Sequence, residues 1–231
     1  MAEFLLLSLL VSWPSKAQEP EQTAQAAKEN SVSAEARSLE ISRELSARQQ
    51  AIENIQSDLG IYDQSLVEVY NDLARFYVEL EDFDNSIRLY TDALQIARIN
   101  TGLYSHEQVP ILDSLIKQNT LAEQWEEVDD LQELYYFVNS RIYDEDDLQY
   151  LEAAEVYGIW KLRLVRENLL DQTGRSLLIT AEDLSHFYER IIEAVEMQPS
   201  IKREDLLKVI YGKSQTDLTL ARSVARTPYT A

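Results

Sequence analysis

The sequence has no cysteine, and only five glycines and five prolines among its 231 residues. Without cysteine it can form no disulfide, no thiolate metal site and no cysteine nucleophile. Scarce glycine and proline leave few places for turns, and the Asn-Gly and Asp-Gly signals of β-hairpins are absent. We therefore expect an all-α protein with long helices. Its core can draw on a hydrophobic content of 45%.

Positive charge is also scarce, because 21 bases face 41 acids and leave a net charge of −20. Between residues 121 and 155 there are twelve acids, and Arg141 is the only base. Nucleic acids and anionic membranes are bound mainly through Lys and Arg, so we expect neither as a partner. This acidity permits a basic partner, but charge of this size more often serves only to keep a protein soluble.

Histidine occurs only at positions 106 and 186. His106 has no acid three or four residues away. His186 has Glu182, Asp183 and Glu189 at helical spacing, which a solvated helix face explains as well as a metal site does. We predict no catalytic or metal-binding role for either histidine.

Two other motifs also fall short of a site. The acidic run 144–147 could attract a cation, but it lacks the alternating ligands and central glycine of a calcium loop. It fits a solvated turn at a helix N-terminus better. Gly212-Lys213-Ser214 resembles the end of a phosphate-binding loop, yet Leu207 stands where the first glycine belongs. We read it as a helix end and predict no catalytic residue, metal or cofactor.

The N-terminus contains a largely apolar run, residues 4–13, followed by Ser15 and Ala17 at the spacing of a signal-peptidase site. The run is too short for a transmembrane helix, which needs about 20 residues. We predict a signal peptide over residues 1–17 and a periplasmic or secreted bacterial protein without stable membrane insertion after cleavage. The alternative is a packed N-terminal helix, because Glu3 stands where a positive residue is expected. Residues 18–36 are mostly small and polar, and we expect a flexible leader.

Searching for internal repeats reveals a period of 42 residues. Gly60-Ile61-Tyr62 returns as Gly102-Leu103-Tyr104. The same shift also pairs Leu73 with Leu115, Phe83 with Trp125, and Leu89 with Leu131. In the clearest unit, apolar and small residues recur at intervals of three and four, which predicts antiparallel amphipathic helices over 64–80 and 84–99. These residues are Tyr70, Leu73, Ala74, Tyr77, Ser86, Ile87, Tyr90, Ala93 and Leu94.

This pattern resembles the tetratricopeptide repeat (TPR), and the 42-residue period is similar to its kinesin-light-chain-type variant. His106 lies where that variant often has histidine in its connector. The resemblance implies a right-handed superhelical array of antiparallel helix pairs, a TPR-like α-solenoid, whose concave face binds protein segments.

Around this unit we expect an incomplete repeat at 43–59, a second at about 105–140, and a stretched third one. The third has helices at about 147–170 and from Thr180 to Pro199, with Thr180 and Asp183 as the cap. Residues 202–211 and 217–225 are expected as capping helices. The predicted domains are therefore a repeat domain at 37–198 and a capping region with a tail at 199–231.

We accordingly predict a non-enzymatic adaptor of the bacterial periplasm that binds a protein or peptide. The resemblance places Asn71, Arg75, Asp113 and Lys117 on the concave face as peptide-binding residues, while the third unit offers Glu152 and Glu155 in place of bases. Ion pairs of Asp113 with Arg75 or Lys117 are the structural alternative. Two other functions stay open, namely a structural subunit of an envelope assembly that uses its acidic surface, and an unrecognised hydrolase.

Overall fold

The computed structural model describes residues 20–226, and over this range it contains eight α-helices and no strand. The prediction of an all-α fold is confirmed. Within the same range, no helix is both long and apolar enough to span a bilayer. The helices are α1 (Pro20–Asp58), α2 (Ser65–Glu79), α3 (Phe83–Thr101), α4 (Gln108–Leu121), α5 (Trp125–Ile142), α6 (Leu148–Glu167), α7 (Gly174–Val195) and α8 (Arg203–Arg226).

The chain divides into two units, residues 1–47 and residues 48–231. In the first unit, residues 20–47 belong to α1, and the predicted signal peptide lies outside the described residues. Most of the expected flexible leader is thus helical rather than irregular, because its Ala, Gln and Glu residues have high helix propensity. The domain boundary at residue 37 stays a prediction.

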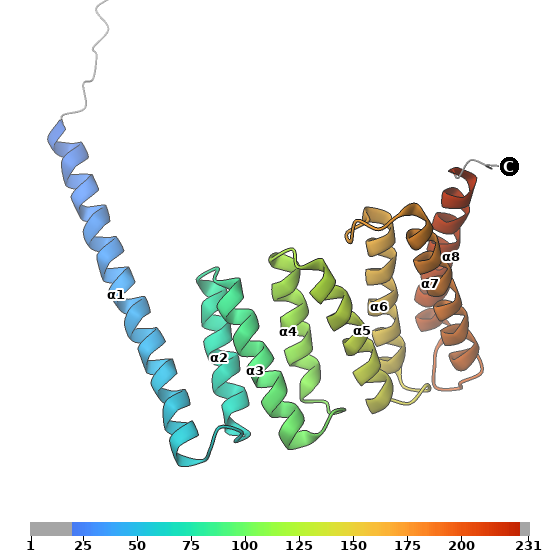
Figure 1. Cartoon of the computed structure of the whole chain (residues 1–231), viewed down its shortest axis with the longest axis horizontal. Helices are drawn as coiled ribbons and strands as arrows, with labels where there is room; N and C mark the ends of the chain where they lie inside the picture. Colours follow the sequence, from blue (N-terminus) through green and yellow to red (C-terminus); the bar gives the residue numbers. More distant parts are fainter. Residues whose placement is uncertain (1–19, 227–231) are drawn as a thin grey trace, which may run out of the picture. The chain divides into compact units, whose positions relative to one another are not determined.

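In the second unit, each helix from α2 onward packs against the next, and α8 also packs against α6 (Figure 1). Helices α2 and α3 are joined by residues 80–82, and α4 and α5 by residues 122–124. Such short connections make each pair an antiparallel hairpin. The two helix pairs predicted from the 42-residue period are confirmed, within two residues at most ends.

The period also appears in the backbone. Glu81 and Glu123, 42 residues apart in the turns of the two hairpins, have φ angles of 59° and 56°. Gly60 and Gly102, which follow α1 and α3, have φ angles of 105° and 87°. Residues with a Cβ atom rarely adopt such backbone angles, so glycine suits both connectors. The recurrence of two unusual conformations at one interval shows that the units are structural repeats.

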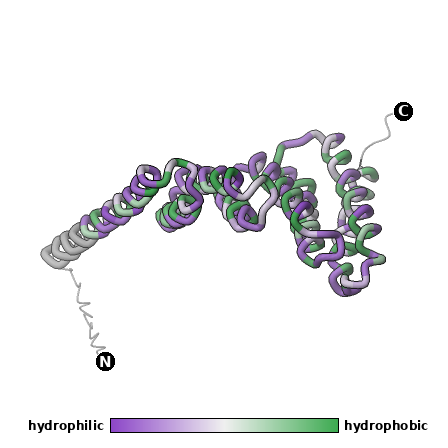
Figure 2. Tube along the Cα trace, turned by 90° about the horizontal axis from the view of Figure 1, so that it is seen from below, coloured by the Kyte–Doolittle hydropathy of each residue, from purple (hydrophilic) through white to green (hydrophobic). Residues whose placement is uncertain are grey.

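The core of the second unit lies along the faces that successive helices turn toward one another. The same repeat position is buried in α2, α4 and α6, where it is filled by Leu66, Gln108 and Tyr150. Figure 2 shows hydrophobic and hydrophilic residues alternating around these helices. That alternation is typical of amphipathic helices, which bury only the apolar stripe.

The last turns of α1 act as the second helix of an incomplete repeat, as predicted for 43–59. Ile52 is buried, and Gln56 donates a hydrogen bond from Nε2 to the Tyr70 hydroxyl at 3.0 Å. The Arg48 guanidinium lies 4.4 Å from the centre of the Phe76 ring. These contacts attach residues 48–58 to α2.

The third hairpin is stretched, as the sequence indicated, and the structure shows where. Helix α7 begins at Gly174, seven residues later than the position that Trp125 of α5 reaches after a shift of 42. The predicted start at Thr180 is wrong. Thr173 is the N-cap, and its side chain accepts a hydrogen bond from the Ser176 amide. Thr173 has the extended backbone conformation and the side-chain hydroxyl that an N-cap needs, so the helix begins after it. The Thr180-x-x-Asp183 pattern lies inside the helix and caps nothing.

The C-terminal region differs from the two capping helices expected at 202–211 and 217–225. Residues 203–226 form the single helix α8, and Gly212 lies inside it rather than at a helix end. A Cβ atom at Gly212 would lie only 2.5 Å from the Tyr188 hydroxyl oxygen. The glycine therefore permits a close approach between α7 and α8.

Candidate functional site

A hollow of about 440 Å³ opens on the exposed side of α6, between it and residues of α4, α5 and α8. We call it the first-helix hollow, because it lies beside the first helices of two repeats. Val156 and Ile159 give it an apolar surface, and Glu152 and Glu155 give it negative charge. Its lining comprises Val109, Tyr135, Asn139, Tyr143, Gln149, Glu152, Ala153, Glu155, Val156, Ile159 and Lys208.

Two residues of the sequence-predicted site lie close to this hollow. Lys117 and Asp113 of α4 form an exposed ion pair with an N···O distance of 2.6 Å. Burial raises the pKa of the hollow's Tyr135, and the Asp113 and Glu152 carboxylates add to that rise. The structure thus brings Asp113 and Lys117 into electrostatic contact with the hollow, although they also satisfy each other.

The other two predicted residues lie on α2. Arg75 forms an ion pair with Asp72 of the same helix. Asn71 is half-buried, and its side-chain oxygen has no hydrogen-bond partner among the described residues. No ion pair joins Arg75 to α4 within residues 20–226. The expected pairing therefore forms within each helix and not between the repeats.

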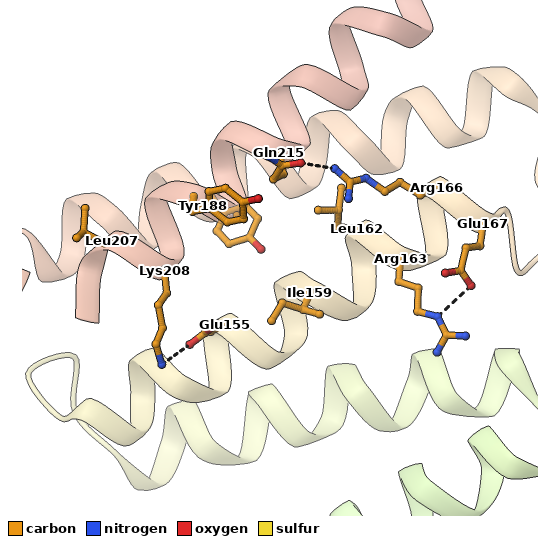
Figure 3. Close-up of a pocket in the computed structure, with 12 residues that line it drawn as sticks. Glu155, Ile159, Leu162, Arg163, Arg166, Glu167, Tyr188, Leu207, Lys208 and Gln215 are labelled. Atoms are coloured by element: carbon orange, nitrogen blue, oxygen red, sulfur yellow. Dashed lines mark hydrogen bonds and ion pairs between the residues drawn. The ribbon is translucent and has the colours of Figure 1, made fainter. Parts of the chain in front are cut away.

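A second and larger hollow lies between α6 and α8, with a volume of about 650 Å³ (Figure 3). We call it the α6–α8 groove, and it shares Glu155, Ile159 and Lys208 with the first-helix hollow. Ile159, Leu207 and Tyr211 are 58%, 59% and 66% exposed. The complete lining is Glu155, Ile159, Leu162, Arg163, Arg166, Glu167, Tyr188, Leu207, Lys208, Tyr211, Gly212 and Gln215.

The charges of the groove are partly neutralised by two ion pairs, which Figure 3 marks. Lys208 of α8 lies 3.4 Å from Glu155 of α6, and Arg163 lies 3.0 Å from Glu167. Arg166 has neutral partners instead and donates to the Gln215 side-chain oxygen at 2.8 Å. The groove therefore keeps one positive charge without a carboxylate partner among the described residues.

The buried side of the groove is formed by Tyr188 of α7, which is only 1% exposed. Its hydroxyl end lies close to Gly158 of α6 and Gly212 of α8, where added Cβ atoms would come within 2.2 and 2.5 Å of the oxygen. Burial raises the pKa of Tyr188 to about 12, and the Glu155 charge contributes to the shift. At neutral pH the hydroxyl is therefore protonated and able to donate a hydrogen bond.

The remaining candidates of the sequence do not form a site. His106 Nδ1 lies 3.2 Å from the Tyr143 hydroxyl, and the two rings meet edge to face, so this histidine joins the α3–α4 connector to the end of α5. His186 is exposed on α7.

The acidic run 144–147 precedes α6 rather than forming its first turn. Three of its carboxylates, those of Asp144, Asp146 and Asp147, can approach within 4.8 Å, but all three residues are exposed. Exposed acids commonly lie this close without an ion. The closeness of these exposed carboxylates is therefore no sign of a metal site.

Part of the site could have been found from the period alone. A shift of 42 residues carries Asp113 to Glu155 and Lys117 to Ile159, and both of these line the two hollows. Arg166, Tyr188 and Lys208 were missed, because α7 and α8 depart from the period. Their meeting depends on how α8 packs on α6 and α7, which has no counterpart in the sequence repeat.

Comparison with known proteins finds similar solved structures at low sequence identity. No family model and no curated protein matches the sequence. The chain is similar to two crystal structures of a Podosopora anserina putative kinesin light chain with nearly identical TPR-like repeats. The first is 10% identical over 82% of this chain and 87% of that chain, with a TM-score of 0.49. The second is 14% identical over 83% and 92%, with a TM-score of 0.45.

The crystal structure of BtubC (BKLC) from P. vanneervenii is also similar, with 15% identity over 91% of this chain and 90% of that chain and a TM-score of 0.39. The hairpins α2–α3 and α4–α5, their small buried residues and their 42-residue spacing identify the architecture directly. The described residues therefore have a TPR-like repeat fold. Such a fold supports a protein-interaction scaffold in general terms.

Proposed function

We propose that the protein is a non-enzymatic adaptor that binds a segment of a partner protein in the first-helix hollow. The observation that carries this proposal is the pairing of apolar Val156 and Ile159 with acidic Glu152 on one exposed surface. Exposed apolar patches rimmed by polar groups are typical of interaction sites. No residue lining either hollow is a histidine, cysteine or serine, which favours binding over nucleophilic catalysis.

The charges of the hollow indicate the chemistry of the segment. Lys117 is engaged by Asp113, and Lys208 by Glu155, whereas Glu152 is exposed and has no ion-pair partner among the described residues. We therefore propose a segment with an apolar side chain for Val156 and a Lys or Arg for Glu152. Asn71, Arg75, Asp113 and Lys117 are proposed to extend the contact along α4 and α2.

The expected result of reversing the charge of Glu152 is a loss of binding by at least tenfold, since a like charge replaces an attractive one at a desolvated contact. The probe is a displayed library of random 12-residue peptides, selected on the full chain and then synthesised for measurement by calorimetry. Selected peptides should combine a basic with an apolar residue. They should lose affinity with Glu152→Lys and with Val156→Asp.

Both changes lie on exposed side chains, so the thermal midpoint should stay within about 2 °C of the unmodified protein. The double variant Arg75→Glu and Lys117→Glu tests whether the peptides bind instead at the predicted residues of α2 and α4. Peptides that respond only to this double change would move the site to those helices. Peptides that respond to neither variant would refute binding on this side of the repeats.

We also propose that the protein acts in a bacterial periplasm, which rests on the sequence of residues 1–17. When the full sequence is expressed in a diderm bacterium, we expect the periplasmic fraction to hold a chain that begins at Gln18. Intact-mass measurement of the fractionated protein checks this. Full-length chain in the cytoplasmic fraction would overturn both the cleavage and the location.

A second candidate function is a subunit of an envelope assembly. It is favoured by four exposed acids on α5, Glu126, Glu127, Asp130 and Glu133, which no ion pair neutralises among the described residues. A complex held by these charges should weaken as salt is raised and should survive Val156→Asp. The adaptor hypothesis predicts the opposite response to Val156→Asp, so this comparison separates the two.

A further inference from the structure

The α6–α8 groove has the size and lining of a small-molecule site. Its volume of about 650 Å³ falls within the range of about 300–1,000 Å³ that is usual for such sites, which are mostly apolar with a few polar groups. Figure 3 shows Arg166 and the Glu155–Lys208 pair toward opposite ends, with Leu162 and Ile159 between them. An elongated apolar ligand could lie along this path.

One end of the groove carries a positive charge that no carboxylate neutralises among residues 20–226. Arg166 donates from Nη2 to Gln215 at 2.8 Å and from Nε to the Thr219 hydroxyl at 3.3 Å. Both acceptors are neutral side chains of α8, and they hold the guanidinium of this α6 residue in place. A fixed guanidinium with a donor to spare is suited to a carboxylate, which it binds by charge-assisted hydrogen bonds.

The buried side of the groove offers a second polar group. Tyr188 is 1% exposed, and its hydroxyl makes no hydrogen bond to any residue that the structure describes. Gly158 and Gly212 lie close to the ring on two sides and restrict its movement, so the hydroxyl stays at the wall of the groove. There it can donate a hydrogen bond to an oxygen of a bound ligand.

We propose that the α6–α8 groove binds a free amphiphilic carboxylate of the fatty-acid class. Its carboxylate pairs with Arg166, one of its oxygens accepts a hydrogen bond from Tyr188, and its chain covers Leu162 and Ile159. This ligand shares Ile159 with the protein segment proposed for the first-helix hollow, but Arg166 and Tyr188, which decide the test, line only the groove. The inference therefore goes beyond the proposed function and fails or succeeds independently of it.

The test uses the full chain and three ten-carbon probes, namely decanoate, decan-1-ol and decylammonium, titrated calorimetrically below their aggregation limits. We expect decanoate to bind at least tenfold more tightly than either of the others. Arg166→Glu should weaken decanoate at least tenfold and should make decylammonium the better ligand. Arg175→Glu, which changes an exposed arginine of α7 that lines neither hollow, is the matched control and should leave decanoate binding unchanged.

Tyr188→Phe separates a ligand contact from a structural one. Removing a hydroxyl that makes no hydrogen bond to a described residue should leave the thermal midpoint unchanged or higher, while decanoate binds about fivefold more weakly. A lower midpoint with unchanged decanoate affinity would show that the hydroxyl serves the fold. Equal binding of decanoate and decan-1-ol, no binding of decanoate, or equal binding to the Arg166→Glu and unmodified proteins would overturn the proposal.

Discussion

Replacing Asp129 with alanine is expected to destabilise the second unit by about 3 kcal/mol. Asp129 of α5 lies between two donors of α6. It accepts a hydrogen bond from the Trp160 indole at 2.8 Å and forms an ion pair with Lys161 at 2.6 Å. The Lys161 and Asp129 side chains are 14% and 19% exposed. Removing the carboxylate therefore takes the counter-charge from Lys161 and the acceptor from the Trp160 indole N–H in a largely dry contact.

The loss of stability affects the contact between α5 and α6, where two repeats meet. Trp160 packs with Val128 and Leu164 in one core cluster, and its ring stacks on Trp125 with centroids 6.4 Å apart. A repeat buries its apolar surface only against its neighbours. Weakening this contact should therefore lower the cooperativity of unfolding as well as its free energy.

Urea denaturation followed by circular dichroism at 222 nm measures both effects. Asp113→Ala is the control, because its ion pair with Lys117 lies within one helix and both side chains are at least half exposed. Such pairs contribute about 0.3–0.5 kcal/mol. Equal losses for the two variants would show that the α5–α6 ion pair is worth no more than a surface one. Asp129→Asn, which keeps an acceptor for the indole, should lie between them.

The sequence predicted the part of the fold in which the chain repeats itself. Tyr70, Leu73 and Ala74 specify one face of α2, and the shift of 42 residues transfers that face to α4 and α6 with the correct side toward the core. Glu81 and Glu123 occupy the same position in the turns of the two hairpins. Periodic positions can be found from sequence because each repeat meets nearly the same neighbours.

The C-terminal part could not be predicted in the same way. The extra residues before Gly174 move α7 out of register, and α8 meets two earlier helices instead of one. Gly212 suggested a helix end because glycine lowers helix propensity, but packing against Tyr188 outweighs that local preference. The α6–α8 groove depends on this non-periodic packing, so its residues Arg166, Tyr188 and Lys208 carried no recognisable spacing. The first-helix hollow, by contrast, lies within the period.

Replacing Gly158 with alanine is the second change for which we expect a large effect. A Cβ atom at Gly158 would lie 2.2 Å from the Tyr188 oxygen and 2.5 Å from Cζ. The ring has little room on the other side, because a Cβ atom at Gly212 would lie 2.7 Å from the same Cζ. Alanine gains about 1 kcal/mol in helix propensity over glycine, whereas overpacking costs about 1–3 kcal/mol.

Because an approach of 2.2 Å is far inside contact distance, we expect the cost to lie at the upper end of this range, about 3 kcal/mol. The net loss is then about 2 kcal/mol, or roughly 4–8 °C in the thermal midpoint for a unit of this size. Gly174→Ala is the matched control, since no atom lies within 4 Å of the added methyl group. The mechanism is tested by repeating Gly158→Ala in a Tyr188→Leu background, where no ring occupies the space of the methyl group. There the same change should be neutral or stabilising, as a double-mutant cycle would show. A loss of the same size in both backgrounds would mean that Gly158 is needed for its backbone and not for the close approach of Tyr188.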